Sequence, residues 1–211
     1  MSEPSESAGQ VEEVVAGLYH WRVCNSAIGG AVSSSHAVDT GVGSVFIDPV
    51  RLADDVLEMV PAPRAVLLTA RCHQRSAWRY RARFGAEVWL PVDAAAADEE
   101  PDHRYAEGDE LPGGLRALRT PGPEWPHYSF LREHRPGVLF CSDLIMGVAP
   151  DAAGGGPRLC FVPPEYHEDP AQTRRSVQGL LDLPFSILCL AHGAPLTDDP
   201  QAALRELLER G

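Results

Sequence analysis

The sequence contains no lysine, so all 18 of its basic residues are arginine, and 30 acidic residues outnumber them. The formal net charge is -12. A surface with this balance repels the phosphate backbone of nucleic acids, so we do not expect a nucleic-acid partner. No apolar run approaches the roughly 20 residues that a membrane-spanning helix requires, so we expect no membrane partner either.

Paired cysteines are missing as well. The five cysteines are scattered at positions 24, 72, 141, 160 and 189, and none forms a C-x-x-C pair. We therefore expect no disulfide framework and a cytoplasmic location. Residues 1–10 are polar and acidic and lack the basic and apolar regions of a secretory signal, which predicts a disordered tail. A single domain is expected over residues 11–211.

Short apolar runs alternate with amphipathic stretches along the chain. The helical stretches are expected at residues 51–60, 76–84 and 170–181 and from residue 200 onwards. Strands are expected at residues 11–15, 18–23, 31–38, 44–47, 65–69, 87–90, 115–119, 128–132, 138–141, 159–162 and 186–190. Each β-rich half ends in a helix, which predicts an αββα sandwich of the α+β class.

The stretch VLLTARCHQRS, residues 66–76, locates the expected site. A buried apolar strand ends there in polar and cationic residues, just before a helical pattern. Because α/β folds place their sites at such strand ends, we expect a small-molecule pocket here. Arg71 and Arg75 are candidates for binding an anionic substrate, because guanidinium groups pair well with carboxylates.

Four stretches, taken in order, resemble the motifs of the metallo-β-lactamase fold family. They are VFIDPV (45–50), VLLTARCHQRS (66–76), RTPGPEWPHYSFL (119–131) with VLFCSDLI (138–145), and ILCLAHGAP (187–195). The resemblance spans residues 11 to 210. It implies two stacked mixed sheets flanked by helices, and hydrolysis by one or two zinc ions that activate water and polarise a carbonyl group.

Carrying the motifs over residue by residue exposes a degenerate metal site. The usual ligand positions hold Ala70, Cys72, Gln74, Arg75 and Pro123. The usual metal-bridging aspartate, Asp143, and the final histidine, His192, are retained. The resemblance further implies that Asp48 supports the site from behind the ligands. Trp125 and His127 lie in the stretch that borders the pocket and are candidates for substrate contact.

Three hypotheses follow. In the first, the site is metal-free and needs no cofactor: Arg75 pairs with Asp143, and the protein binds a small molecule or hydrolyses weakly. In the second, one zinc ion is held by Asp143, His192 and either Cys72 or His73, and the protein hydrolyses an ester, thioester or lactone.

The second hypothesis carries a geometric expectation. Adjacent residues of an extended segment point to opposite sides, so only one of Cys72 and His73 is expected to face the site. In the third hypothesis Cys72 is a nucleophile, with His73 or His192 as its base. The remaining histidines are expected at the surface: His20, His36, His103, His134 and His167.

Overall fold

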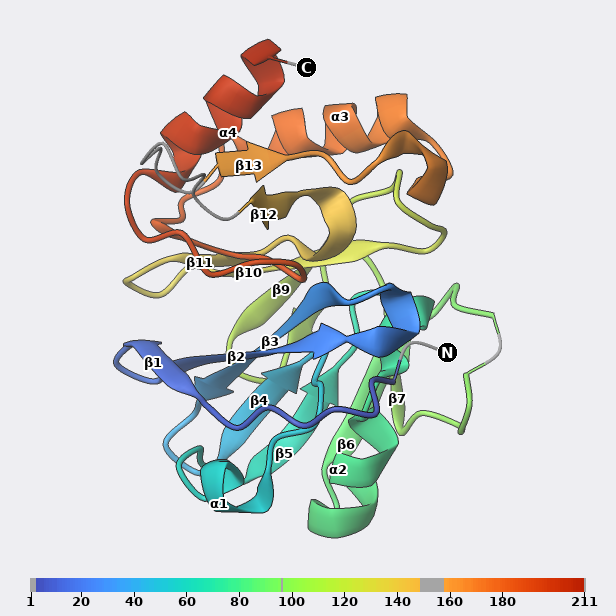
Figure 1. The fold of residues 1–211 in the computed structure, drawn as a ribbon, viewed down its shortest axis with the longest axis vertical. Coiled ribbons are helices and arrows are strands. Elements are labelled where there is room, and N and C mark those ends of the chain that lie inside the picture. Colours follow the sequence, from blue (N-terminus) through green and yellow to red (C-terminus); the bar gives the residue numbers. More distant parts are fainter. Residues whose placement is uncertain (1–2, 96, 149–157, 211) are drawn as a thin grey trace.

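The computed structural model describes residues 3–95, 97–148 and 158–210. Two β-sheets lie face to face, with helices on the outer face of each (Figure 1). This arrangement confirms the predicted αββα sandwich. No helix within the described ranges is long and apolar enough to cross a membrane.

The first sheet has seven strands in sequence order. Strands β1 to β4 pair antiparallel, whereas β4 to β7 pair parallel. The parallel strands are covered on both faces, which explains their continuous apolar runs. The strands are β1 (Glu12–Val15), β2 (Leu18–Asn25), β3 (Ala31–Asp39), β4 (Ser44–Ile47), β5 (Pro63–Leu67), β6 (Glu87–Pro91) and β7 (His103–Tyr105).

The second sheet has five strands in the order β14-β11-β10-β9-β8, with β11 and β14 parallel. A separate antiparallel pair, β12 and β13, lies between this sheet and the helices above it (Figure 1). These strands are β8 (Glu110–Leu111), β9 (Leu115–Arg119), β10 (Tyr128–Arg132), β11 (Val138–Phe140), β12 (Met146–Val148), β13 (Arg158–Cys160) and β14 (Ile187–Cys189).

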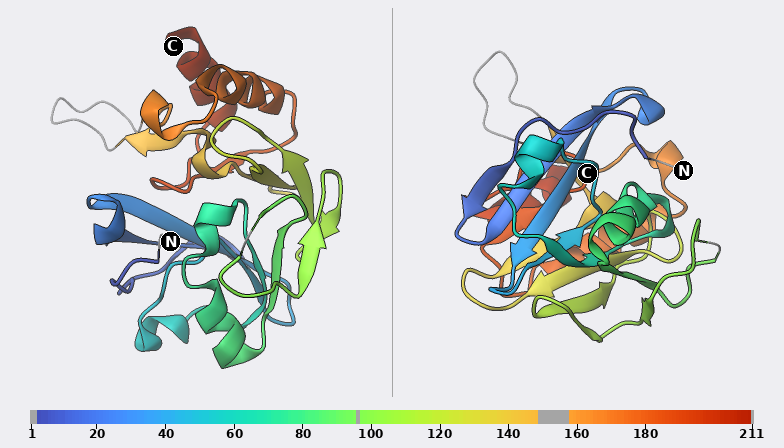
Figure 2. Two further views of the ribbon diagram at one scale, coloured as in Figure 1. Left: turned by 90° about the vertical axis from the view of Figure 1, so that its right-hand side faces the viewer. Right: turned by 90° about the horizontal axis from the view of Figure 1, so that it is seen from below.

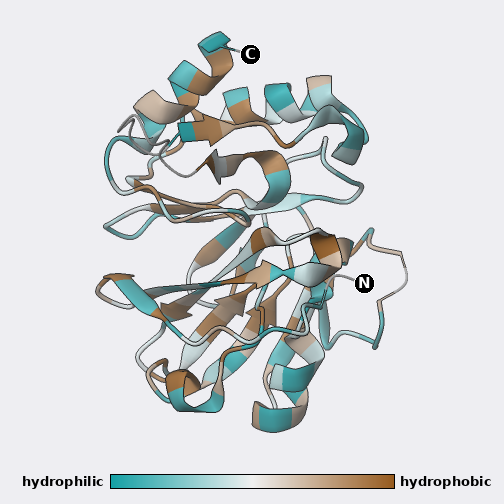
Figure 3. Cartoon of the chain, viewed as in Figure 1, coloured by the Kyte–Doolittle hydropathy of each residue, from teal (hydrophilic) through white to brown (hydrophobic). Residues whose placement is uncertain are grey.

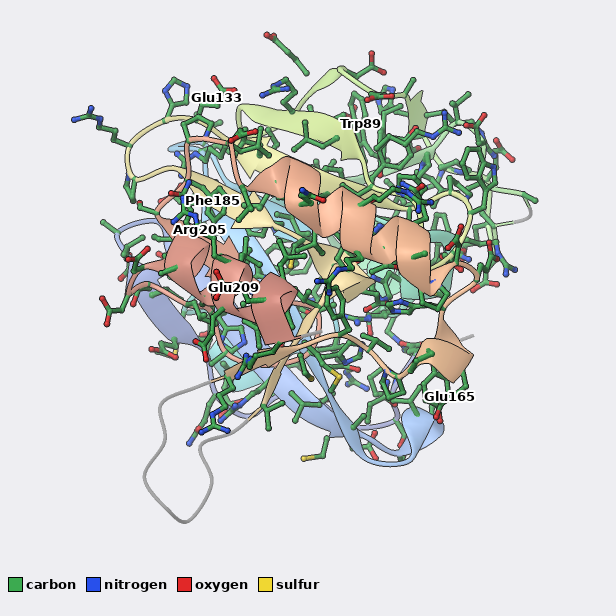
Figure 4. The ribbon with its side chains drawn as sticks, turned by 90° about the horizontal axis from the view of Figure 1, so that it is seen from above. Trp89, Glu133, Glu165, Phe185, Arg205 and Glu209 are labelled. Atoms are coloured by element: carbon green, nitrogen blue, oxygen red, sulfur yellow. The ribbon has the colours of Figure 1, made fainter. Side chains whose placement is uncertain are left out.

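The helices cover the outer faces of the two sheets (Figure 2). Helices α1 (Asp54–Leu57) and α2 (Ala77–Phe84) pack on the first sheet, and α3 (Pro170–Leu180) and α4 (Pro200–Arg210) on the second. Figure 4 shows α3 and α4 running across the top of the molecule, with Arg205 and Glu209 on α4. Helix α3 begins as expected, because Asp169 accepts a hydrogen bond from the Gln172 amide and Pro170 occupies the first turn.

Three apolar layers hold the sandwich together. The middle layer lies between the sheets and includes Tyr105, Phe130 and Phe140, each at most 2% exposed. The two outer layers lie beneath the helices, around Trp21 and Val177 respectively. Hydrophobic residues accordingly follow the strands, and hydrophilic residues cover the outward turns of the helices (Figure 3).

Two parts of the structure differ from the sequence-based expectation. The helix expected over residues 51–60 is a single turn, Asp54–Leu57, because Val50 and Leu52 form an extended, buried segment before it. Residues 3–10, for which the composition predicts a disordered tail, lie against that segment. Ala8 is 3% exposed, and its backbone amide donates to the Arg51 carbonyl.

Candidate metal centre

Four chain segments that follow parallel strands meet at one place. Asp48 follows β4, and His73 lies in the 3-10 helix η2 (Arg71–Gln74) after β5. Asp143 lies in η3 (Ser142–Leu144) after β11, and His192 follows β14. The carboxyl ends of parallel strands form sites in this way in many α/β proteins.

Asp48 is the innermost residue of this cluster and is 4% exposed. Its Oδ1 accepts the Thr69 amide at 2.9 Å, and its Oδ2 accepts the Thr69 hydroxyl at 2.6 Å. The same Oδ2 lies 3.0 Å from His73 Nδ1. Burial would raise the pKa of Asp48, but His73, Arg75 and Thr69 together lower it, so the carboxylate is the stable form. Asp48 has the strained φ of 46° often found at functional sites.

His73 lies between two carboxylates. Its Nδ1 faces Asp48, and its Nε2 lies 3.0 Å from Asp143 Oδ2. Burial would lower the pKa of His73, but the negative charges of Asp143 and Asp48 raise it well above the usual value. In the absence of a metal ion, His73 is therefore an imidazolium that joins the two carboxylates.

His192 approaches the other oxygen of Asp143. Its Nε2 lies 3.1 Å from Oδ1, and its Nδ1 lies 2.5 Å from the Val32 carbonyl oxygen. Burial would raise the pKa of Asp143, but His73 and His192 hold it well below its usual range. Asp143 is thus an anion approached by an imidazole on each side.

The partners of the two rings assign their neutral tautomers. A carbonyl oxygen can only accept, so His192 carries its proton on Nδ1, and its Nε2 lone pair points at Asp143. A neutral His73 that donates Nδ1–H to Asp48 also points an Nε2 lone pair at Asp143. Asp143 Oδ1 has no hydrogen-bond partner among the described groups. The Nε2 lone pairs of His73 and His192 then both face the negatively charged carboxylate of Asp143. These groups repel one another unless protons or a metal ion add positive charge.

Cys72 belongs to the same cluster. One ligand atom each from Cys72, His73 and Asp143 lie within 4.8 Å of one another, which is compatible with a shared metal ion. The expectation that only one of Cys72 and His73 faces the site is wrong. It assumed an extended segment, whereas residues 71–74 form a kinked 3-10 helix. Burial raises the pKa of the Cys72 thiol, so the metal-free side chain is neutral.

Arg75 does not pair with Asp143, contrary to the first hypothesis. Its Nη1 donates to the carbonyl oxygens of Ser34 at 2.7 Å and Asp48 at 2.9 Å, and the residue is 3% exposed. No carboxylate of the described residues lies within 4.0 Å of its guanidinium. The backbone at Arg75 has a positive φ of 39° at the end of η2, which the sequence did not indicate. The guanidinium acts at longer range, by lowering the pKa of Asp48.

The other expected site residues differ in exposure. Arg71 is exposed, and Trp125 is 53% exposed with the Arg119 guanidinium 3.9 Å from its ring centre. His127 is 1% exposed and turns inward. Its Nδ1 lies 2.8 Å from the Thr120 carbonyl oxygen, and its Nε2 accepts the Asp143 amide at 3.3 Å. His127 thus supports the backbone of Asp143.

Sequence reasoning missed two neighbours of the site. Glu124 Oε1 accepts the Cys72 amide at 3.1 Å. His167 is 9% exposed and lies close enough to Asp143 to feel its charge. The expectation that His20, His36 and His167 lie at the surface is wrong, because all three are buried. The sequence places them in turn-like or exposed contexts, and no local pattern distinguishes them from surface histidines.

Comparison with solved structures identifies the fold. The DIM-1 metallo-β-lactamase exposed to ceftazidime superimposes with a TM-score of 0.70 at 12% identity, covering 97% of this chain and 98% of that one. The chain has the metallo-β-lactamase fold. The mono-zinc form of FIM-1 from Pseudomonas aeruginosa gives a TM-score of 0.69 at 12% identity, with 100% and 98% of the two chains covered.

A third protein of this metallo-β-lactamase fold is more similar in sequence. TTHA1623 in a di-iron-bound form shares 21% identity with a TM-score of 0.60, covering 83% of this chain and 93% of that one. No family model and no curated protein matches the sequence. The resemblance seen in the four motifs is therefore confirmed at the level of the fold.

Proposed function

We propose that this protein binds a single zinc ion through His73, Asp143 and His192, with Cys72 beside them, and slowly hydrolyses an ester, thioester or lactone. The observation that carries the proposal is the pair of imidazole Nε2 atoms on one carboxylate, at 3.0 and 3.1 Å. Both rings have an acceptor for their Nδ1 proton, which leaves Nε2 free to ligate.

The donor set suits zinc. Imidazole nitrogen, carboxylate oxygen and thiolate sulfur are its usual ligands. The contact between Asp48 and His73 Nδ1 is of the kind that orients metal-binding histidines. Zinc could replace one proton on His73 and one on Cys72, which leaves the net charge of the buried cluster unchanged.

A bound zinc ion would lower the pKa of a water molecule and polarise a substrate carbonyl group. The chain's own residues hold this arrangement in place. Asp48 fixes the tautomer and orientation of His73, and His127 holds the Asp143 amide. Arg71 and Trp125 offer a cation and an apolar ring on the exposed side, for a small substrate with an anionic or apolar part.

Proteins of this fold can bind metal ions, as the descriptions of two structural neighbours state, and this supports a metal site in the present chain. FIM-1 is described in a mono-zinc form and TTHA1623 in a di-iron-bound form. The losses at Ala70 and Pro123 favour one metal ion over two in this protein.

A metal-free small-molecule binder is the second candidate. Its supporting observation is the high pKa of His73, because an imidazolium between Asp48 and Asp143 balances both charges without a cofactor. The two candidates differ in what occupies the space between the Nε2 atoms and Asp143, which is either protons or zinc.

Metal stoichiometry separates the candidates. We would measure zinc on the purified protein, after chelation and after re-addition, for the wild type, Asp143→Asn and the exposed control Asp198→Asn. The proposal expects one zinc per chain in the wild type and the control, and none in Asp143→Asn. The wild type and Asp198→Asn should hydrolyse thioester and lactone test substrates, and Asp143→Asn should not. A wild type that takes up no zinc establishes the metal-free candidate.

A further inference from the structure

Trp125 is a large apolar residue beside the candidate site, and 53% of its surface is exposed. A single exposed apolar side chain is common on protein surfaces. Its meaning therefore depends on where the ring lies and on what holds it there. An aromatic ring that is fixed in place at the rim of a site offers a large contact area to a bound molecule.

Hydrogen bonds on both sides of Trp125 connect its segment to the site. Glu124, the preceding residue, accepts the Cys72 amide through Oε1 at 3.1 Å. His127, two residues later, accepts the Asp143 amide through Nε2 at 3.3 Å. Because neighbouring Cα atoms are only about 3.8 Å apart, the Trp125 backbone cannot lie far from either contact. This segment therefore borders the site.

The Trp125 ring lies over an ion pair that joins the two sheets. The Arg119 guanidinium is 3.9 Å from the ring centre, and its Nη2 lies 3.3 Å from Asp93 Oδ2. Arg119 ends β9 of the second sheet, whereas Asp93 follows β6 of the first (Figure 1). Strand β6 pairs parallel with β5, which η2 follows, so Asp93 and η2 lie at the same edge of that sheet. The ring is thus held beside the site, on the side of β6.

The guanidinium determines which chemical groups the rest of the ring can bind. A cation is attracted to the negative face of an aromatic ring, and Arg119 already supplies one. A second cation on the opposite face would be repelled by this charge, whereas an apolar or aromatic group would not. Val92, which precedes Asp93, is 49% exposed and adds an apolar side chain at the same edge. The surroundings of Trp125 therefore favour a flat apolar partner over a cationic one.

We infer that Trp125 determines the substrate class of this site by packing against an aromatic acyl group of an ester or thioester. The inference rests on the proposed function and specifies the substrate of the same site. Aromatic rings pack favourably in offset or edge-to-face arrangements, which an exposed and fixed indole can provide. Small acyl groups, such as acetyl, would not reach the ring and would lose this contact.

The test measures kcat/KM for thioesters of N-acetylcysteamine that carry a phenylacetyl, an acetyl or a trimethylammonioacetyl group. The wild type is compared with Trp125→Ala, with Arg119→Met, and with the control Met59→Ala, whose apolar side chain is exposed beside α1. Calorimetry of phenylacetate and acetate, with and without zinc, measures binding without turnover. Thermal melting checks that each variant is folded.

We expect the wild type to prefer the phenylacetyl over the acetyl thioester, and this preference to fall at least about tenfold in Trp125→Ala. The loss should be smaller in Arg119→Met, which removes the charge beneath the ring, and absent in Met59→Ala. Phenylacetate should bind the wild type more tightly than acetate does, and this difference should disappear in Trp125→Ala.

The outcomes separate this inference from the proposed function. An unchanged preference in folded Trp125→Ala, or a wild type that is fastest with the cationic thioester, would overturn the inference and leave the proposed hydrolysis intact. A wild type that hydrolyses none of the thioesters would overturn the hydrolysis. Calorimetry then decides the inference: loss of phenylacetate binding in Trp125→Ala supports it, and equal binding by the two proteins overturns it.

Discussion

Histidine side chains from three separate chain segments surround Asp143. His73 and His192 approach its two carboxylate oxygens, and His127 accepts its backbone amide. The sequence motif pointed to Asp143 and His192. It left open whether Cys72 or His73 faces Asp143, because that depends on the backbone of η2.

Asp48 offers a test of the orientation of His73. Asp48→Asn weakens the acceptor for Nδ1–H, so the ring loses the tautomer that presents an Nε2 lone pair. We expect zinc affinity to fall about 10- to 100-fold, measured by chelator competition. Asp55→Asn, an exposed aspartate in α1, serves as the control. Equal affinities for the two variants would contradict the supporting role of Asp48.

We expect Arg75 to stabilise the folded protein rather than to take part in the site. Arg75→Met removes the donor to the Ser34 and Asp48 carbonyl oxygens and leaves both buried. We expect a loss of about 2–4 kcal/mol in the free energy of unfolding, measured by urea denaturation. The control is Arg205→Met on the exposed side of α4 (Figure 4). A stable Arg75→Met protein would show that these carbonyl contacts are dispensable.

At the scale of elements, the turn η2 decides which side chains reach the site. The sequence predicts a strand over residues 65–69, and an extended segment after it would place Cys72 and His73 on opposite sides. The structure ends β5 at Leu67 and winds residues 71–74 into a 3-10 helix, so both side chains face Asp143. Tertiary contacts, such as the Cys72 amide on Glu124, fix this turn, and no local signal encodes them.

Helix α3 packs closely against the loop of residues 121–123. A Cβ atom on Gly122 would lie 2.4 Å from the Thr173 backbone nitrogen, and Gly122 has a φ of +134°. We expect Gly122→Ala to destabilise the protein by about 1–3 kcal/mol in urea denaturation. Gly179→Ala, within α3 and facing open space, should be neutral or slightly stabilising. Equal stability of the two variants would contradict close packing at Gly122.

At the scale of the molecule, the alternation of strands and helices was enough to predict the sandwich. The four motifs located the site because they lie at strand ends, where topology alone brings Asp48, Asp143 and His192 together. The very short strands β7, β8 and β12 were missed, since runs of two or three residues carry no periodicity. The burial of His20 and His36 was missed because their burial depends on the facing sheet.

Buried neutral histidines make the fold sensitive to acid. Burial lowers the pKa of His20 and of His127 to about 4, compared with 6.5 in the unfolded chain. The folded state therefore binds fewer protons, and stability falls as the pH drops from 6.5 towards 4. Each group contributes up to about 1.4 kcal/mol per pH unit in that window. His73, whose pKa is raised, adds stability that is fully present below pH 6.5 and is lost as the pH rises through its folded-state pKa, so its contribution is constant across this window.

Urea denaturation at pH 7, 6 and 5 measures this dependence. We expect the midpoint to fall steadily over the series and to fall less in His20→Gln. His134→Gln, which replaces an exposed histidine, should behave as the wild type. A midpoint that does not change between pH 7 and pH 5 would contradict the burial of neutral imidazoles.

The position of the site between the two sheets has a mechanical consequence. Asp48 and His73 follow strands of the first sheet, whereas Asp143 and His192 follow strands of the second. An ion held by His73 on one side and by Asp143 and His192 on the other would be a reversible cross-link between the halves of the sandwich. Zinc at a hundred times its dissociation constant should therefore add about 2.7 kcal/mol to stability, visible as a melting temperature that rises with zinc concentration. The resistance of the two sheets to separation would therefore depend on the zinc concentration around the protein.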